Sequence, residues 1–238
     1  MTPRIEVVAM DALMLRLFDR IEEGNLPWLL AAQARIAEAF GDALLDLVPS
    51  YTTLMLHYDV TRLDLAEARR RLAGALVDLN VPGDGGGACH TLPVWYDPRV
   101  GPELGRLAER GGMEPEDVVR LHSEREYRVF ALGFAPGFAF MGLVDPRLAA
   151  PRLDTPRARV AAGSVGIAER QTAAYPLASP GGWNLIGRTP ARLFDREREG
   201  YSLLRPGDRV RFEAIDHPTF LRLGGDDAPL APAEGCAP

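Results

Sequence analysis

Two arginines and a set of neutral polar side chains mark the part of this sequence best equipped for chemistry. Arg157 and Arg188 each lie in a turn-rich stretch that carries few other charges. A guanidinium in such a setting suits bidentate capture of a carboxylate or phosphate. A structural salt bridge or a surface charge explains either arginine equally well. Gln171 and Thr172, close to Tyr175, add an amide and a hydroxyl of the kind that orients a small polar substrate.

The segment from Gly133 to Asp195 is crowded with glycine, proline and aromatic residues. Glycine permits close backbone approach or a positive φ, and proline fixes φ. Gly137, Phe138 and Phe140 are therefore predicted to shape a pocket with aromatic walls. A compact β-barrel with many corners explains the same composition, and in that case at least two of Phe134, Phe138 and Phe140 belong to its core.

Ser164 and His122 are the residues that most resemble catalytic groups. Ser164 comes close to the nucleophile motif G-x-S-x-G, but Ala162 breaks the motif. We therefore expect Ser164 to offer its hydroxyl or backbone N–H to a bound group, although a serine in a simple tight turn is nearly as good an explanation. His122 ends a predicted helix, where an acid–base role competes with a plain interaction with the helix dipole. The four histidines show no metal-ligand spacing, so no metal site is predicted.

The composition excludes several classes of chemistry, because the 238 residues include no lysine. This chain therefore has no Walker-type phosphate loop, no Schiff base and no attached biotin. A net charge of −6 argues against nucleic acid as a partner. No apolar run reaches the roughly 18–20 residues that span a membrane. Its first residues do not resemble a secretory signal, and its two cysteines have no redox spacing, so we expect a cytoplasmic protein.

Composition shifts along the chain predict two domains. Residues 1–81 are predicted to form a small α+β domain of two strands, a helix, two strands and a helix. Residues 82–89, rich in glycine, are predicted to be a linker. Short strands alternate with Gly and Pro turns over residues 90–225, which favours a closed barrel. Residues 226–238 are expected to be a disordered tail.

Several motifs in this order resemble one known family. It contains the B subunit of bacterial 5-oxoprolinase, the KipI-type kinase inhibitors and the protein once called allophanate hydrolase subunit 1, and a related segment occurs in the carboxyltransferase region of urea carboxylase. The resemblance covers Leu92 to Ile215 strongly and Leu13 to Asp64 loosely. The matching pieces are Leu121-His122-Ser123 with Glu126-Tyr127, Gly133-Phe134, Pro136-Gly137-Phe138, Pro151-Arg152, Thr155-Pro156-Arg157, Ala162–Ile167, Gln171-Thr172, Tyr175-Pro176, Ser179–Trp183, and Ile186-Gly187 with Thr189.

The resemblance implies a fold, a reaction and partners. The implied fold is a small N-terminal α+β sandwich domain followed by a cyclophilin-like β-barrel. The implied reaction is the ATP-dependent opening of the lactam 5-oxoproline to glutamate. This chain would act in it as the B subunit, with a C subunit of homologous fold and an A subunit as partners. ATP is held by the complex and not necessarily by this chain, and biotin, if it takes part, belongs to another chain.

Within that function, the residues divide into two expected roles. His122, Arg157 and Gln171 are predicted to be catalytic, the histidine as acid or base and the other two as hydrogen-bond donors. The residues predicted to bind the substrate are Gly137, Phe138, Phe140, Ser164, Thr172, Tyr175 and Arg188. The sequence departs from the usual family pattern around this pocket, at Ala139–Met141, Glu169-Arg170 and Ala173.

Two other functions stay open at this point. One is a KipI-like regulatory protein that inhibits a histidine kinase through the surface of the barrel. The other is a carboxyltransferase component of a urea carboxylase or allophanate-type enzyme.

Overall fold

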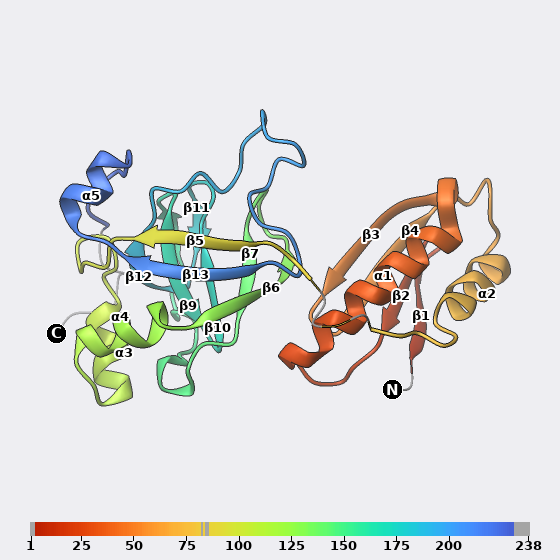
Figure 1. Cartoon of the computed structure of the whole chain (residues 1–238), viewed down its shortest axis with the longest axis horizontal. Helices are drawn as coiled ribbons and strands as arrows, with labels where there is room; N and C mark the ends of the chain where they lie inside the picture. The colour runs from red at the N-terminus through yellow and green to blue at the C-terminus, as the bar shows by residue number, and fades with distance from the viewer. Residues whose placement is uncertain (1–2, 82, 84–85, 231–238) are drawn as a thin grey trace. The chain divides into compact units, whose positions relative to one another are not determined.

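The computed structural model describes residues 3–81, 83 and 86–230. The chain divides into two compact units, Met1–Gly87 and Ala88–Pro238 (Figure 1). Each unit has its own hydrophobic core, so each is described by itself. In the described part of the chain, no helix combines the length and the apolar character needed to cross a membrane.

The first unit is a four-stranded antiparallel sheet covered on one face by two helices. The strand order is β1-β2-β4-β3, and the core gathers apolar side chains from the sheet and from both helices (Figure 1). The second helix begins at Leu65, because the carboxylate of the preceding Asp64 accepts a hydrogen bond of 2.7 Å from the backbone N–H of Glu67. The elements are β1 (Arg4–Ala9), β2 (Ala12–Arg16), η1 (Glu23–Asn25), α1 (Leu26–Phe40), η2 (Gly41–Ala43), β3 (Leu44–Ser50), β4 (Thr53–Tyr58) and α2 (Leu65–Ala75).

The second unit is a nearly closed β-barrel. Its seven-stranded sheet has the order β12-β9-β10-β7-β6-β13-β5, and β11 and β8 form a separate pair. The two edges meet where Trp95 and Arg188 exchange two backbone hydrogen bonds of 2.9 Å. The elements are β5 (Cys89–Val94), α3 (Leu104–Gly111), α4 (Pro115–Ser123), β6 (Glu126–Leu132), β7 (Ala139–Gly142), η3 (Pro146–Leu148), β8 (Arg157–Val160), β9 (Ser164–Ala168), β10 (Gln171–Ala174), β11 (Ser179–Gly181), β12 (Asn184–Arg188), β13 (Arg209–Ala214) and α5 (His217–Arg222). The predicted α+β class, a small α+β sandwich followed by a barrel, is confirmed.

The β9–β10 hairpin has an apolar core on each of its faces. Val165 and Ile167 point into the main core of the barrel, which also takes side chains from α3 and α4. Ala168 and Ala173 point the opposite way, into a second cluster built largely from aromatic rings. This alternation follows from the two-residue repeat of a strand, and it places the aromatic cluster outside the main core.

Both ends of this unit differ from the sequence-based expectation. The predicted linker 82–89 overlaps the barrel, because β5 begins at Cys89 and Ala88 pairs through its backbone with Arg209 and with the side chain of Asp208. The predicted disordered tail also begins too early. Residues Asp226–Leu230 are held against the barrel by hydrogen bonds, whereas 231–238 lie outside the described residues.

Candidate functional site

A small cleft with aromatic walls lies on the outer face of the β9–β10 hairpin. Its volume is about 90 Å³. Phe138 is at its centre, with its ring centroid 5.1 Å from that of Tyr175, 4.9 Å from that of Phe140 and 5.7 Å from that of Trp183. Such edge-on and tilted packing fixes the rings relative to one another. The residues that line the cleft are Phe134, Phe138, Phe140, Arg152, Tyr175, Pro180, Gly181, Gly182 and Trp183.

Strand periodicity and one glycine position these walls. Phe138 directly precedes β7 and Phe140 lies two residues later, so both rings point to the same side. Tyr175 follows β10 in the same way, two residues after Ala173. A Cβ atom at Gly181 would lie 2.3 Å from the Tyr175 hydroxyl oxygen. Only glycine therefore allows the β8–β11 pair to close one side of the cleft.

Phe134 has the most unusual backbone of the cleft residues. Its φ is +69°, in the left-handed region that bulky side chains avoid, and its side chain is 65% exposed. Phe134 also lines a larger neighbouring cavity of about 490 Å³, together with Gly137 and Tyr201. Gly137 itself has φ +80°, and a Cβ atom there would lie 2.9 Å from the Cβ of Phe194. A strained, exposed aromatic residue between two cavities is typical of a ligand-contact position.

Arg152 brings a positive charge to the cleft. Burial raises the pKa of Tyr175 to about 12, and the nearby guanidinium groups of Arg152 and Arg157 oppose that rise. The Tyr175 hydroxyl therefore keeps its proton at neutral pH and is able to donate a hydrogen bond. Arg152 is exposed where it lines the cleft. The cleft thus combines flat apolar walls, a neutral hydroxyl and a cation, which suits a small ring that carries an anionic group.

Arg157 lies behind the cleft. It pairs with Gly181 across β8 and β11, but its side chain is buried and forms an ion pair with Glu103 at the start of α3. The second oxygen of Glu103 accepts a hydrogen bond of 2.9 Å from the backbone N–H of Leu185 in β12. The pair therefore ties a helix to two strands. This geometry corresponds to the structural salt bridge that the sequence left open, rather than to a donor facing a substrate.

His122 and Thr172 form a buried chain of hydrogen bonds. Nδ1 of His122 is 2.7 Å from the hydroxyl of Tyr96, and Nε2 is 2.8 Å from the hydroxyl of Thr172. Thr172 in turn donates to the carbonyl oxygen of Gly166 at 3.1 Å. Burial lowers the pKa of His122 to about 3. The histidine is therefore neutral and enclosed, and its geometry does not favour the acid–base role expected from the sequence.

Three of the predicted site residues, Arg157, Gln171 and Ser164, lie apart on different strands of the barrel. Gln171 and Ser164 lie at opposite ends of the β9–β10 hairpin, about 13 Å apart along the strand at 3.3 Å per residue. Neither of the two cavities described above is lined by any of the three. Ser164 instead lies between two other predicted residues. It is opposite Arg188 in β12, and its carbonyl oxygen accepts a hydrogen bond of 2.9 Å from the N–H of Tyr175.

Comparison with known proteins identifies the family. The family model described as "Carboxyltransferase domain, subdomain C and D" matches residues 3–204. The B subunit of 5-oxoprolinase from Bacillus subtilis (strain 168) is 35% identical over 227 residues, which cover 91% of this chain and 95% of that protein. The chain belongs to the family of 5-oxoprolinase B subunits. The protein of the same name from Escherichia coli O157:H7 is 51% identical over 121 residues, which cover 51% of this chain and 56% of that protein.

Solved structures of related proteins agree with this placement. TTHA0988 is 41% identical with a TM-score of 0.75, and the match covers 87% of this chain but 40% of that one. The protein PH0987 from Pyrococcus horikoshii is 36% identical with a TM-score of 0.55, and the match covers 91% of this chain and 100% of that one. Urea carboxylase of Kluyveromyces lactis has a TM-score of 0.75 at 15% identity, over 95% of this chain and 23% of that one. That last likeness is one of fold alone.

Three residues important for the site were not among those predicted. Arg152 and Trp183 lie inside the motifs Pro151-Arg152 and Ser179–Trp183, so their motifs carried a usable signal. Glu103 had no signal, because a single acidic residue at a helix start is common on protein surfaces.

Proposed function

We propose that this chain is the B subunit of an ATP-dependent 5-oxoprolinase, which opens 5-oxoproline to glutamate together with partner subunits. The observation that carries the proposal is the 35% identity with the 5-oxoprolinase B subunit of Bacillus subtilis over 95% of that protein. Urea carboxylase shares only the fold at 15% identity, so the carboxyltransferase alternative has weaker support. The kinase-inhibitor alternative and the cytoplasmic location stay predictions from the sequence.

The aromatic cleft supports the proposal through the shape and charge of its lining. 5-Oxoproline is a small five-membered lactam with one carboxylate. Its ring would lie between the side chains of Phe138, Tyr175 and Trp183, and its carboxylate would pair with the guanidinium of Arg152. The neutral hydroxyl of Tyr175 would donate a hydrogen bond to the lactam oxygen. In this arrangement, Gly137, Phe134 and Phe140 shape the walls.

The reaction requires groups beyond those of this chain. In the proposed reaction, the lactam oxygen attacks the γ-phosphorus of ATP and ADP leaves. Water then adds to the activated carbon, the C–N bond breaks, and phosphate and glutamate are released. This sequence has no lysine to contact the transferred phosphate. We therefore propose that ATP is bound mainly by the partners, an A subunit and a C subunit, while this chain positions the lactam.

The direct test is to assemble the complex and assay it. The chain is co-expressed with its candidate partner subunits, and glutamate formation and ATP hydrolysis are measured with and without 5-oxoproline. We expect ATP hydrolysis that depends on 5-oxoproline. Absence of glutamate from a complete, folded complex would refute the proposal.

A matched pair of arginine variants tests the position of the substrate. Arg152→Ala removes the cation at the cleft, and Arg159→Ala removes an exposed arginine of β8 that does not line it. Loss of a charge-assisted hydrogen bond is expected to raise the KM for 5-oxoproline by about 10–100-fold in Arg152→Ala. Arg159→Ala should leave KM unchanged. Equal KM values for the two variants would mean that the lactam binds elsewhere.

A further inference from the structure

Arg188 carries a buried positive charge that no buried carboxylate neutralises among the described residues. Its side chain is 2% exposed, and the carboxylate of Asp226, 3.9 Å away, is 75% exposed. Nη1 of Arg188 instead donates hydrogen bonds to two backbone carbonyl oxygens, that of Asp226 at 2.6 Å and that of Ala228 at 3.0 Å. A carbonyl oxygen bears only a partial charge, so the guanidinium keeps most of its capacity for an anion.

Two buried polar atoms, one in this guanidinium and one on a neighbouring strand, have no hydrogen-bond partner in the described part of the chain. They are Nε of Arg188 and the hydroxyl oxygen of Ser164, whose residue is fully buried. Ser164 and Arg188 are directly opposite in the β9–β12 pair, so their side chains share a face. A Cβ atom at Gly163 would lie 2.3 Å from the carbonyl oxygen of Thr189 and 3.2 Å from Cγ of Arg188. Position 163 therefore has no room for a side chain next to these donors.

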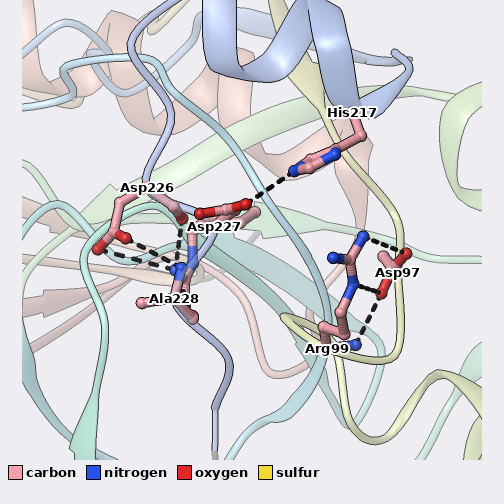
Figure 2. Close-up of polar contacts among 7 residues, drawn as sticks. Asp97, Arg99, His217, Asp226, Asp227 and Ala228 are labelled. Carbon is pink, nitrogen blue, oxygen red and sulfur yellow. Dashed lines mark hydrogen bonds and ion pairs between the residues drawn. The ribbon is translucent and has the colours of Figure 1, made fainter.

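The carbonyl oxygens that accept hydrogen bonds from Arg188 come from one short segment, Asp226–Leu230, which we call the strap. It contains no helix or strand and follows α5. The carboxylate of Asp227 is 2.9 Å from Nε2 of His217, and Asp226 caps the N–H of Ala228 at 3.0 Å (Figure 2). The N–H of Leu230 donates to the carbonyl oxygen of Arg99 at 2.8 Å. A few partly exposed polar contacts thus hold the strap in place.

The strap ends beside the proposed substrate cleft. The side chain of Leu230 packs against the aromatic cluster that contains Phe138 and Tyr175. The backbone of Ser164 bonds to Tyr175 on one side and faces Arg188 on the other. Movement of the strap would therefore uncover the guanidinium of Arg188, which lies on the same face as Ser164.

We propose that Arg188 and Ser164 form a carboxylate-binding site that the strap closes in this structure. The two carbonyl oxygens of the strap occupy the place of the ligand's oxygens. When the strap lifts, a small carboxylate accepts hydrogen bonds from the guanidinium, including the buried Nε, and from the Ser164 hydroxyl. The backbone bonds between Trp95 and Arg188 keep the barrel closed in both states.

The site is defined by carboxylate binding to the isolated chain, and only the choice of 5-oxoproline and glutamate as probes rests on the proposed function. Acetate serves as a third probe with no relation to that reaction. If acetate binds in a strap-dependent way and 5-oxoproline does not, the site stands as a carboxylate site that excludes the lactam, and the proposed function is decided separately by the activity of the assembled complex.

A reversible disulfide across the strap tests the proposal. Arg99→Cys and Leu230→Cys introduce the two thiols. The backbone hydrogen bond between these positions places their Cα atoms within about 6 Å, as a disulfide requires. Cys89→Ser and Cys236→Ser remove the native cysteines, so that no other disulfide forms. Binding of the three probes is measured by calorimetry before and after reduction. We expect the oxidised form to bind at least tenfold more weakly than the same protein after reduction. Acetate binding that is equal in the two forms, or absent from both, would overturn the proposal.

Single substitutions in the full chain provide independent evidence. Asp227→Ala removes the contact with His217, and a loosened strap should tighten carboxylate binding several-fold because the open state is more populated. Ser164→Ala should weaken binding about 3–10-fold through loss of one hydrogen bond. Ser202→Ala is the matched control, since Ser202 also has a buried hydroxyl without a partner among the described residues but lines the other cavity. Equal affinities of Ser164→Ala and Ser202→Ala would overturn the site.

Discussion

The barrel buries two arginines, Arg157 and Arg188, and the groups that pair with them differ. Arg157 is paired with the buried carboxylate of Glu103, which also accepts a backbone hydrogen bond from β12. Arg188 is buried too, but its recorded partners among the described residues are two backbone carbonyl oxygens and one exposed carboxylate. Burial also lowers the pKa of Arg188. The first arrangement neutralises a charge inside the fold, whereas the second leaves a charge that a removable segment covers.

His122 shows a third way to bury a basic side chain. Burial lowers its pKa to about 3, so the ring is neutral and serves as a bridge between Tyr96 and Thr172. Arg157 is paired with a carboxylate, Arg188 is bonded to carbonyl oxygens and His122 is neutral. The free-energy cost of burying each side chain therefore differs. Burial of a basic residue is therefore a poor guide to a functional site. The chemical nature of the group that pairs with the residue is a better guide.

The largest effect is expected for Glu103→Gln. The substitution leaves the buried Arg157 without a counter-ion, which should lower the free energy of unfolding by about 3–5 kcal/mol. Urea denaturation measures the change, and Glu109→Gln, on the exposed side of α3, is the control. The double variant Glu103→Leu, Arg157→Met should be less destabilised than Glu103→Leu alone or Arg157→Met alone. A loss below about 1 kcal/mol for Glu103→Gln would show that the pair is not structural.

The next effect is a dependence of stability on pH that comes from His122. Its folded pKa lies below the unfolded value of about 6.5, so the unfolded chain binds more protons in the interval between them. This contribution to stability is complete above pH 6.5 and is lost as pH falls towards 3, by up to about 1.4 kcal/mol per pH unit. His122→Asn should lack this component when the two proteins are unfolded in urea at about pH 7.5 and about pH 5. Identical pH dependence would contradict a neutral, buried His122.

Arg188→Met should cost less than Arg157→Met. It removes two hydrogen bonds to carbonyl oxygens but leaves no unpaired buried carboxylate, so we expect a loss of about 1–2 kcal/mol. Arg157→Met strands Glu103 and should cost about 3–5 kcal/mol. Urea denaturation of both variants measures the difference. Equal losses would remove the distinction between the two arginines.

The smallest effect is expected for Asp226→Asn. Its carboxylate is 75% exposed and 3.9 Å from Nη1 of Arg188, so solvent screens the attraction. The change in unfolding free energy should stay below about 0.5–1 kcal/mol. A larger loss in urea denaturation would mean that Asp226 is the counter-ion of Arg188, and that the carbonyl oxygens of the strap are secondary.

Local sequence signals determined much of the fold. The Asp64 cap of α2, Pro27 in the first turn of α1 and the alternation of β13 each depend on residues only a few positions apart. The same local logic placed Phe138, Phe140 and Tyr175 on pocket walls. It failed at Asp226–Leu230, because composition suggested disorder where long-range hydrogen bonds hold the strap.

The sequence by itself also determined what chemistry this chain lacks, since the absence of lysine requires no structure to interpret. Only the tertiary structure decided the roles of the buried side chains. Glu103 is 54 residues from Arg157, His122 is 50 from Thr172, and the strap is about 40 from Arg188. Whether an arginine is neutralised or available depends on the partner that folding brings to it from a distant part of the chain. Residue type and spacing do not encode that partner, because the barrel closure that unites them is a property of the whole sheet.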